Sequence, residues 1–284
     1  MSEKKKVEGS RFLREFKPAL KHLLGILLRK YGYASILAVD SEAKIYSVAA
    51  SGINIGDFGM LCNRGFVIKV YNEGEYAEYS FNKLERDVTE QAQQIIEQIE
   101  ALKKAVPDKL ERIKLGMLED KPLKFSKSTE YEINPFETGA QNIIDKLTAL
   151  RKKGLEADER MLDCTARMSC QKYSKLFLSE NKDMEQNVLW TDCAMSFLAR
   201  RGNEVKSYFS SASNLGGSEI LESLEADIPH SVEMTVALLD SEPMVPGEYD
   251  CICTPEVTGM IVHEAFGHGV EMDMFAKDRA LAKN

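Results

Sequence analysis

The sequence predicts an α+β protein, and three observations lead to this class. Apolar residues recur at helical spacing in several separate stretches, and alternating stretches typical of β-strands lie between the first two of them. From Leu162 onward the alternation becomes nearly continuous, which indicates an antiparallel meander. We therefore expect an N-terminal α+β domain over residues 1–158 and a β-rich domain over residues 159–284 that ends in a buried helix.

The first elements alternate between helix and hairpin. Apolar residues from Phe16 to Leu27 predict an amphipathic helix over about Ser10 to Lys30. Two strands, Tyr33 to Asp40 and Lys44 to Ser51, are expected to pair as a hairpin. The glycine-rich stretch Gly52 to Gly59 has no phosphate-loop spacing, so we interpret it as a turn or flap.

A second hairpin and two helices follow. Strands Phe66 to Tyr71 and Tyr76 to Phe81 should pair across a turn at Asn72-Glu73-Gly74. Helical spacing from Val88 to Leu102 predicts a helix that ends before Pro107, and a further helix is expected from Ala140 to about Gly154. The charged stretch from 107 to 135 is either a connection or a surface excursion.

The β-rich part is expected to hold the aromatic core. Its predicted strands are Leu162 to Gln171, Lys175 to Leu178, Val188 to Arg200 and Glu204 to Ser211. The large side chains on these strands are expected to be core residues, namely Met168, Phe177, Trp190, Met195, Phe197 and Phe209. A helix should start near Pro229, with His230 as an exposed or capping residue.

Composition excludes several classes of protein. The net charge is −8, from 37 basic and 45 acidic residues, so the chain has no nucleic-acid or anionic-membrane signature. No apolar run is long enough to span a bilayer, and no signal peptide is recognisable, so a cytoplasmic location is expected.

The six cysteines are scattered and do not read as a disulfide framework. They are Cys62, Cys164, Cys170, Cys193, Cys251 and Cys253. The last two lie on a predicted strand, Tyr249 to Cys253, where they are expected to pack as small apolar residues. The alternative is that one of them approaches a metal ion.

The chemistry of the chain concentrates in the stretch His263-Glu264-Ala265-Phe266-Gly267-His268. Two of only four histidines bracket a glutamate here. Neutral imidazole is the commonest metal ligand, and a carboxylate beside two such ligands can take a proton from water. The stretch therefore predicts His263 and His268 as ligands of a divalent metal, and the alternative is a buried helix whose histidines only form hydrogen bonds.

The two histidines are five residues apart, not four as in the familiar HExxH helix. On a regular α-helix five residues place them roughly 140° apart. They can meet at one ion if the helix widens into a π-type turn or ends between them. We expect Thr254 and Pro255 to start the helix and a distortion or ending at Gly267 to Gly269.

The same residues resemble the TldD/PmbA family of metalloproteases, on the side that keeps the metal motif. The resemblance rests on the segments Pro246 to Tyr249, Pro255 to Gly259 and His263 to Glu271. It implies His263 and His268 as ligands of a divalent metal, most simply Zn²⁺, and Glu264 as the catalytic base. Glu271 either orients His268 or is a solvated acid, and Asp273 is a weaker candidate for the orienting role.

The family resemblance also implies a third ligand and a partner. The third ligand would be a cysteine from a C-terminal part of the family fold, expected beyond residue 284, so the sequence looks like a truncated member. The expected reaction is hydrolysis of unfolded peptides inside a two-subunit assembly, either a homodimer or a complex with a PmbA-like subunit. The alternative function is a non-catalytic structural subunit of such an assembly.

Overall fold

The fold was established from a computed structural model, which describes residues 4–57, 63–85, 87–105 and 116–280. Cys62, Gly59 and Pro107 lie outside these ranges. The elements in chain order are β1 Lys5–Lys6, α1 Arg11–Leu28, β2 Tyr33–Ala49, β3 Gly52–Asp57, β4 Arg64–Asn72, β5 Glu75–Phe81, α2 Val88–Ala105, β6 Leu123–Ser128, β7 Glu130–Tyr131, α3 Ala140–Glu156, β8 Met161–Ser179, β9 Lys182–Arg201, β10 Glu204–Leu215, α4 Leu221–Ala237, α5 Pro255–Val262 and α6 Met272–Ala276. The predicted α+β class is confirmed.

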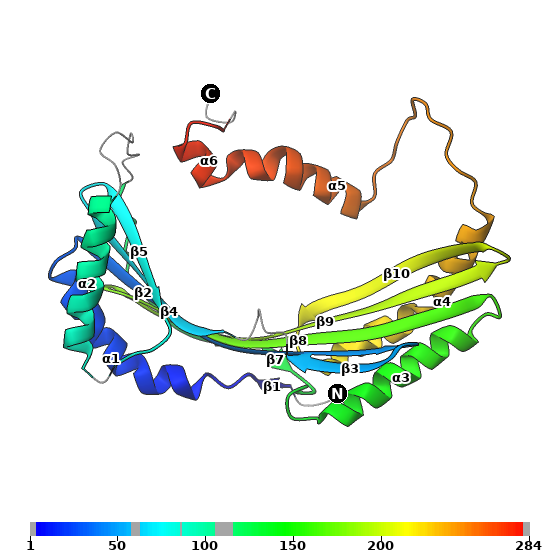
Figure 1. The fold of residues 1–284 in the computed structure, drawn as a ribbon, viewed down its shortest axis with the longest axis horizontal. Coiled ribbons are helices and arrows are strands. Elements are labelled where there is room, and N and C mark those ends of the chain that lie inside the picture. Colours follow the sequence, from blue (N-terminus) through cyan, green and yellow to red (C-terminus); the bar gives the residue numbers. More distant parts are fainter. Residues whose placement is uncertain (1–3, 58–62, 86, 106–115, 281–284) are drawn as a thin grey trace.

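One curved sheet organises the molecule (Figure 1). Its strands follow the order β10-β9-β8-β2-β4-β5, with antiparallel pairing throughout this path. Strand β3 pairs with the second half of β2, and β6 pairs in parallel with the start of β9. Helices α1 to α4 lie on the convex side, and the concave side faces α5 across an open space (Figure 1). No helix among the described residues combines the length and apolar character that crossing a membrane needs.

Two apolar cores lie between the sheet and its helices. The first packs leucines of α1, such as Leu20 and Leu23, and isoleucines of α2 against Ile36 and Ile68 of the sheet. The second packs α3 and α4 against β8 and β9, with Phe197 fully buried. Burying side chains of this size contributes about 1.5–3 kcal/mol each, so these two layers supply most of the stability.

Several predicted elements are confirmed. Helix α1 begins where the sequence places it, because the side chain of Ser10 accepts a hydrogen bond from the backbone N–H of Leu13 at 3.1 Å. Strands β4 and β5 form the expected hairpin, with positive φ at Glu73 and Gly74. Helices α2 and α3 also match their predicted ranges.

The long strands correct three predictions. Residues 41–43 do not form a turn, because β2 continues through them and pairs with β8 along 14 positions from Ser35 to Val48. The glycine-rich stretch is strand β3 as far as Asp57, not a flap. Strand β8 likewise continues through Lys172 to Ser174. Pairing with a neighbouring strand therefore overrides the local polar residues that suggested turns.

Two further predictions are wrong. Helix α4 starts at Leu221 and contains Pro229, so the predicted start near Pro229 is wrong. His230 lies in the middle of the helix and is exposed as expected, and its ring meets that of Tyr208 edge-on at 6.2 Å. Trp190 and Phe209 are 41% and 54% exposed, because they point to the concave face that no helix covers. Met168, Met195 and Phe197 are buried as predicted.

The sheet continues across residue 158. Strand β2, before this position, pairs with β8, after it. The second core also contains Tyr46 and Leu147 from the first part of the chain, and the first core contains Leu178 from the second part. The division into domains at residue 158 stays a prediction from the sequence.

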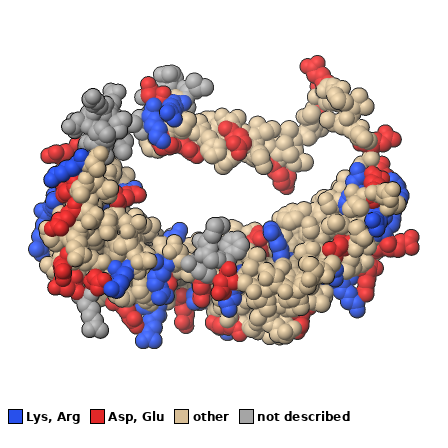
Figure 2. Space-filling view, viewed as in Figure 1, with Lys and Arg blue, Asp and Glu red and all other residues tan. Residues whose placement is uncertain are grey.

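The C-terminal segment leaves the sheet after α4. Residues 241–254 form no helix or strand, so the strand predicted from Tyr249 to Cys253 is wrong, and both Cys251 and Cys253 are exposed. Helix α5 then crosses above the concave face, and Figure 2 shows few charged side chains along it. The predicted burial of this helix is also wrong, since Met260, Ile261 and Phe266 are each more than half exposed.

Candidate metal centre

The helix that carries the histidines starts at the predicted place. Thr254 is its N-cap with extended backbone, Pro255 occupies the first turn, and the N–H of Thr258 donates to the carbonyl of Thr254 at 2.9 Å. The side chain of Thr254 makes no capping hydrogen bond. Proline at this position sets φ for the helix and removes a donor that would have no helical partner.

The helix widens between the two histidines, as the spacing predicts. Residues His263 to Gly267 form a π-helical turn, in which the backbone N–H of His268 donates to the carbonyl of His263. A short 3₁₀ turn follows over His268–Val270, and Glu271 has an extended backbone. The i to i+5 hydrogen bond therefore joins the two histidines themselves.

This turn brings the candidate side chains together. The rings of His263 and His268 lie 4.6 Å apart between centroids, at 75° to each other. One ligand atom from each of His263, Glu264 and His268 lies within 4.8 Å of the others. The Nε2 of His268 is 3.8 Å from a carboxylate oxygen of Glu264.

Glu271 contacts the other ring nitrogen of His268, Nδ1. Its carboxylate lies 2.8 Å from Nδ1 of the imidazole, and this contact raises the pKa of His268. An imidazole whose Nδ1–H donates to a carboxylate has its Nε2 lone pair free for a metal ion. Asp273, the weaker candidate, instead pairs with Lys277 at 2.9 Å.

The cluster fits a divalent metal in chemistry and approximate spacing. Zinc takes imidazole nitrogens and carboxylate oxygens at about 2.0–2.2 Å, so two ligand atoms on a tetrahedral ion are roughly 3.3 Å apart. The atoms here lie within 4.8 Å of one another, which is wider than that spacing, and all three side chains are exposed. Neither Cys251 nor Cys253 belongs to the cluster.

The site is open to solvent in the described residues. The side chains of Glu264 and His268 are 63% and 52% exposed, and that of Glu271 is 51% exposed. Sequence reasoning found the residues that the structure brings together but missed this exposure. A helix rich in valine, isoleucine and methionine predicts burial, and the pattern itself does not say which surface does the burying.

Comparisons with known proteins agree with the resemblance seen in the sequence. A curated protein named metalloprotease from Synechocystis is 25% identical over 288 residues, which cover 92% of this chain and 55% of the relative. A second metalloprotease, from Methanothermobacter thermautotrophicus, is 34% identical over 82 residues, or 28% of this chain and 18% of that protein. The chain thus spans about half the length of the first relative, and no protein-family model matches it.

Solved structures share the fold. TldE from Thermococcus kodakarensis superposes with a TM-score of 0.54 at 17% identity, over 78% of this chain and 47% of that one. A protein from Bacteroides thetaiotaomicron described as a "putative modulator of DNA gyrase" gives a TM-score of 0.61 at 16% identity, over 90% of this chain and 57% of that one. Together with the metalloprotease relatives, these structures confirm the resemblance of the chain to the TldD/PmbA family.

Proposed function

We propose that this chain provides the metal-binding part of a TldD-type metallopeptidase. His263 and His268 hold a divalent metal, most simply zinc, and Glu264 is the general base. The observation that carries the proposal is the π-helical turn, because it gathers two imidazoles and a carboxylate that a regular helix would separate. The metalloprotease names of the relatives support the same reaction class.

The residues divide the chemistry between them. When bound, the metal ion supplies Lewis acidity toward a peptide carbonyl and lowers the pKa of a water molecule. Glu264 accepts the proton of the attacking water and passes it to the leaving amine. Glu271 accepts a hydrogen bond from Nδ1 of His268 and so keeps Nε2 directed to the ion.

The remaining parts of the site are proposed to come from outside residues 1–284. Zinc sites that catalyse reactions have three protein ligands, and the cluster offers two histidines beside the base. We assign the third ligand to a cysteine that follows, and the partner to a second copy or a PmbA-like subunit. The substrates are unfolded peptides and the location is the cytoplasm.

The test compares hydrolysis of an unfolded peptide by the purified, zinc-loaded protein and by a Glu264→Gln variant. General bases contribute about 10²–10⁴-fold, so the variant should lose activity by that factor while it still binds zinc. Glu256→Gln is the matched control, since Glu256 is an exposed glutamate on the same helix outside the cluster.

A Glu264→Gln variant as active as the wild type would contradict the assignment of the base. Zinc-loaded protein that hydrolyses no peptide, alone or with its partner, would favour the alternative of a non-catalytic structural subunit. The exposure of the Glu264 and His268 side chains in the described residues supports that alternative.

A further inference from the structure

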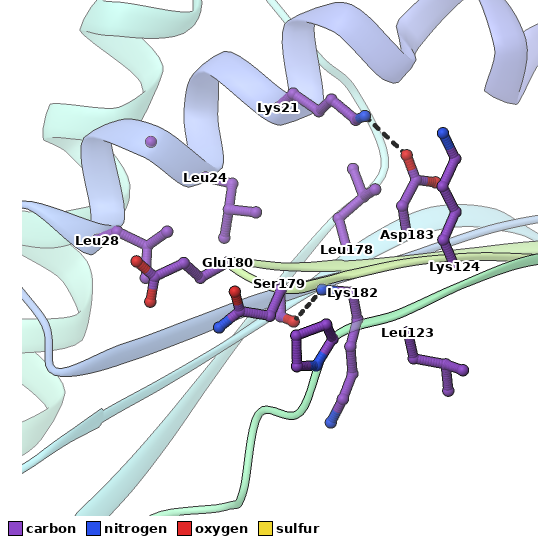
Figure 3. Close-up of a pocket in the computed structure, with 13 residues that line it drawn as sticks. Lys21, Leu24, Leu28, Leu123, Lys124, Leu178, Ser179, Glu180, Lys182 and Asp183 are labelled. Carbon is purple, nitrogen blue, oxygen red and sulfur yellow. Dashed lines mark hydrogen bonds and ion pairs between the residues drawn. The ribbon is translucent and has the colours of Figure 1, made fainter.

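A cavity of 580 Å³ lies between α1, the turn that joins β8 to β9, and the start of β6 (Figure 3). None of its lining residues belongs to the metal-binding segment. Its volume falls within the roughly 300–1,000 Å³ of small-molecule sites in proteins. No sequence motif marks this cavity, because the three elements that line it are far apart in the chain.

The polar wall of this cavity is held in place by hydrogen bonds. Asp120 accepts from the hydroxyl of Ser179 at 2.6 Å and from the backbone N–H of Asn181 at 3.1 Å. On the opposite side Asp183 lies 2.6 Å from the ammonium of Lys17 and 2.7 Å from that of Lys21. A preformed wall lowers the ordering cost of binding a ligand.

Helix α1 leaves room over the cavity at Gly25. A Cβ atom placed on Gly25 would have no heavy atom within 4 Å. Glycine inside a helix costs about 0.5–1 kcal/mol relative to alanine, and no steric contact requires it here. The helix therefore carries a destabilising residue where any side chain would narrow the cavity.

The lining has an apolar middle and an unpaired charge at each end. Leu28 and Leu123 supply its accessible apolar surface, whereas Leu24 and Leu178 belong to the first core and are only 5% and 1% exposed. In Figure 3, Glu180 lies beside Leu28, and Lys124 lies beside Asp183 at the other end. Within the described residues, no hydrogen bond or ion pair engages the side chain of Glu180 or Lys124.

We propose that this cavity binds a short apolar peptide by both of its free ends. The α-amino group pairs with Glu180, the α-carboxylate pairs with Lys124, and the apolar side chains lie over the leucines. A fatty acid matches the apolar surface and Lys124 but leaves Glu180 without a cation. The site is separate from the metal centre and does not depend on the metallopeptidase proposal.

The first experiment titrates metal-free protein with trileucine in a calorimeter. One saturable site is expected. The N-acetylated and the C-amidated forms of trileucine should each bind about two- to fivefold more weakly, the range of one exposed ion pair. Decanoate, which has the apolar chain and the carboxylate but no amine, serves as the competing probe.

Variants locate the site. Gly25→Leu should abolish binding, whereas Gly259→Leu, also a helical glycine with open space around it, should leave binding unchanged. Lys124→Gln should remove the preference for a free carboxylate and Glu180→Gln the preference for a free amine. Lys146→Gln, an exposed lysine on α3, is the charge control, and His263→Ala should bind trileucine like the wild type.

Three results would overturn the proposal. The first is no binding of trileucine, and the second is full binding by Gly25→Leu that thermal unfolding shows to be folded. The third is decanoate or the end-blocked peptides binding as tightly as trileucine, which would make the cavity a plain apolar site. Loss of binding in His263→Ala alone would place the peptide at the metal centre instead.

Discussion

The orientation of one imidazole depends on a single carboxylate. Glu271 lies three residues after His268 and contacts its Nδ1, although the turn between them is 3₁₀ and not α-helical. The sequence could identify both residues, because their types and spacing are visible in it. It could not choose between an orienting and a solvated Glu271, since that depends on the backbone of residues 268–271.

Gly217 lies where no side chain fits. A Cβ at this position would be 1.8 Å from the carbonyl oxygen of Ile133, which itself accepts a hydrogen bond from Ser218. We predict that Gly217→Ala lowers the free energy of unfolding by about 2–4 kcal/mol, because backbone must move. Chemical denaturation of the two proteins measures the difference.

The matched control is Gly25→Ala, where the new methyl group meets open space. Alanine is the better helix former, so this variant should be more stable than the wild type by about 0.5–1 kcal/mol. Equal stability of Gly217→Ala and the wild type would show that residues 133 and 217 are farther apart than described.

The ion pairs of Asp183 with Lys17 and Lys21 make a pH-dependent contribution to the stability of the chain. Burial raises the pKa of Asp183, but hydrogen bonds and charges from Lys17 and Lys21 outweigh this and lower the pKa below its ordinary value of 3.8. The stabilisation is therefore present above pH 3.8 and is lost as the pH falls through the lowered folded-state pKa.

We predict that Asp183→Asn costs about 1 kcal/mol or less at pH 7, since the partners are partly exposed. The difference in the free energy of unfolding between the two proteins should vanish when it is measured at a pH below the folded-state pKa of Asp183. A difference that is the same at pH 7 and in that acidic range would mean that shape, not charge, makes residue 183 important.

At the scale of elements, the π-helical turn brings together two histidines whose spacing does not suit a regular helix. His263 and His268 are five positions apart, and a regular helix would direct their side chains away from each other. Deleting Ala265 places the two histidines four positions apart, a spacing that a regular α-helix puts on one face. We therefore predict that the deletion variant keeps zinc binding within about tenfold and loses the π turn.

Inserting one alanine after Ala265 is the control for that deletion. Six residues rotate the second histidine by roughly 240° on a regular helix, so zinc binding should be lost. If the deletion abolishes zinc binding as completely as the insertion, the histidines meet the ion by a geometry other than the one described.

The elements show where local sequence is sufficient. Helices α1, α2 and α3 follow from apolar spacing and start signals, and the β4–β5 hairpin follows from its Asn-Glu-Gly turn. The continuity of β2 and β8 could not be predicted, because residues 40–43 of β2 and 171–174 of β8 are held in strand by pairing with each other. That pairing joins positions about 130 residues apart in sequence.

At the scale of the whole molecule, the C-terminal segment, residues 241–280, differs from helices α1 to α4. Those helices pack against the sheet and contribute residues to its two cores, whereas this segment does not. Met244, Ile252 and Met272 are more than 70% exposed, and helix α5 contributes no residue to either core. The sequence indicated burial from composition alone. In the structure, the described residues before position 241 do not supply an apolar surface that covers Met244, Ile252 or Met272.

Local stability should follow this division. Backbone amides of α5 should exchange with solvent deuterium on the order of 100-fold faster than those of β8 and β9, whose hydrogen bonds lie inside the sheet. Hydrogen exchange read by mass spectrometry on the isolated chain measures both. Equal protection of α5 and β9 would contradict the open position of the segment.

The central claim is that His263 and His268 bind one metal ion together, and zinc content by elemental analysis tests it most directly. The account predicts stoichiometric zinc in the purified protein, its loss in His263→Ala and in His268→Ala, and its retention in His230→Ala, which removes an exposed histidine from α4. Zinc that is absent from the wild type, or that stays bound in both His263→Ala and His268→Ala, would contradict it.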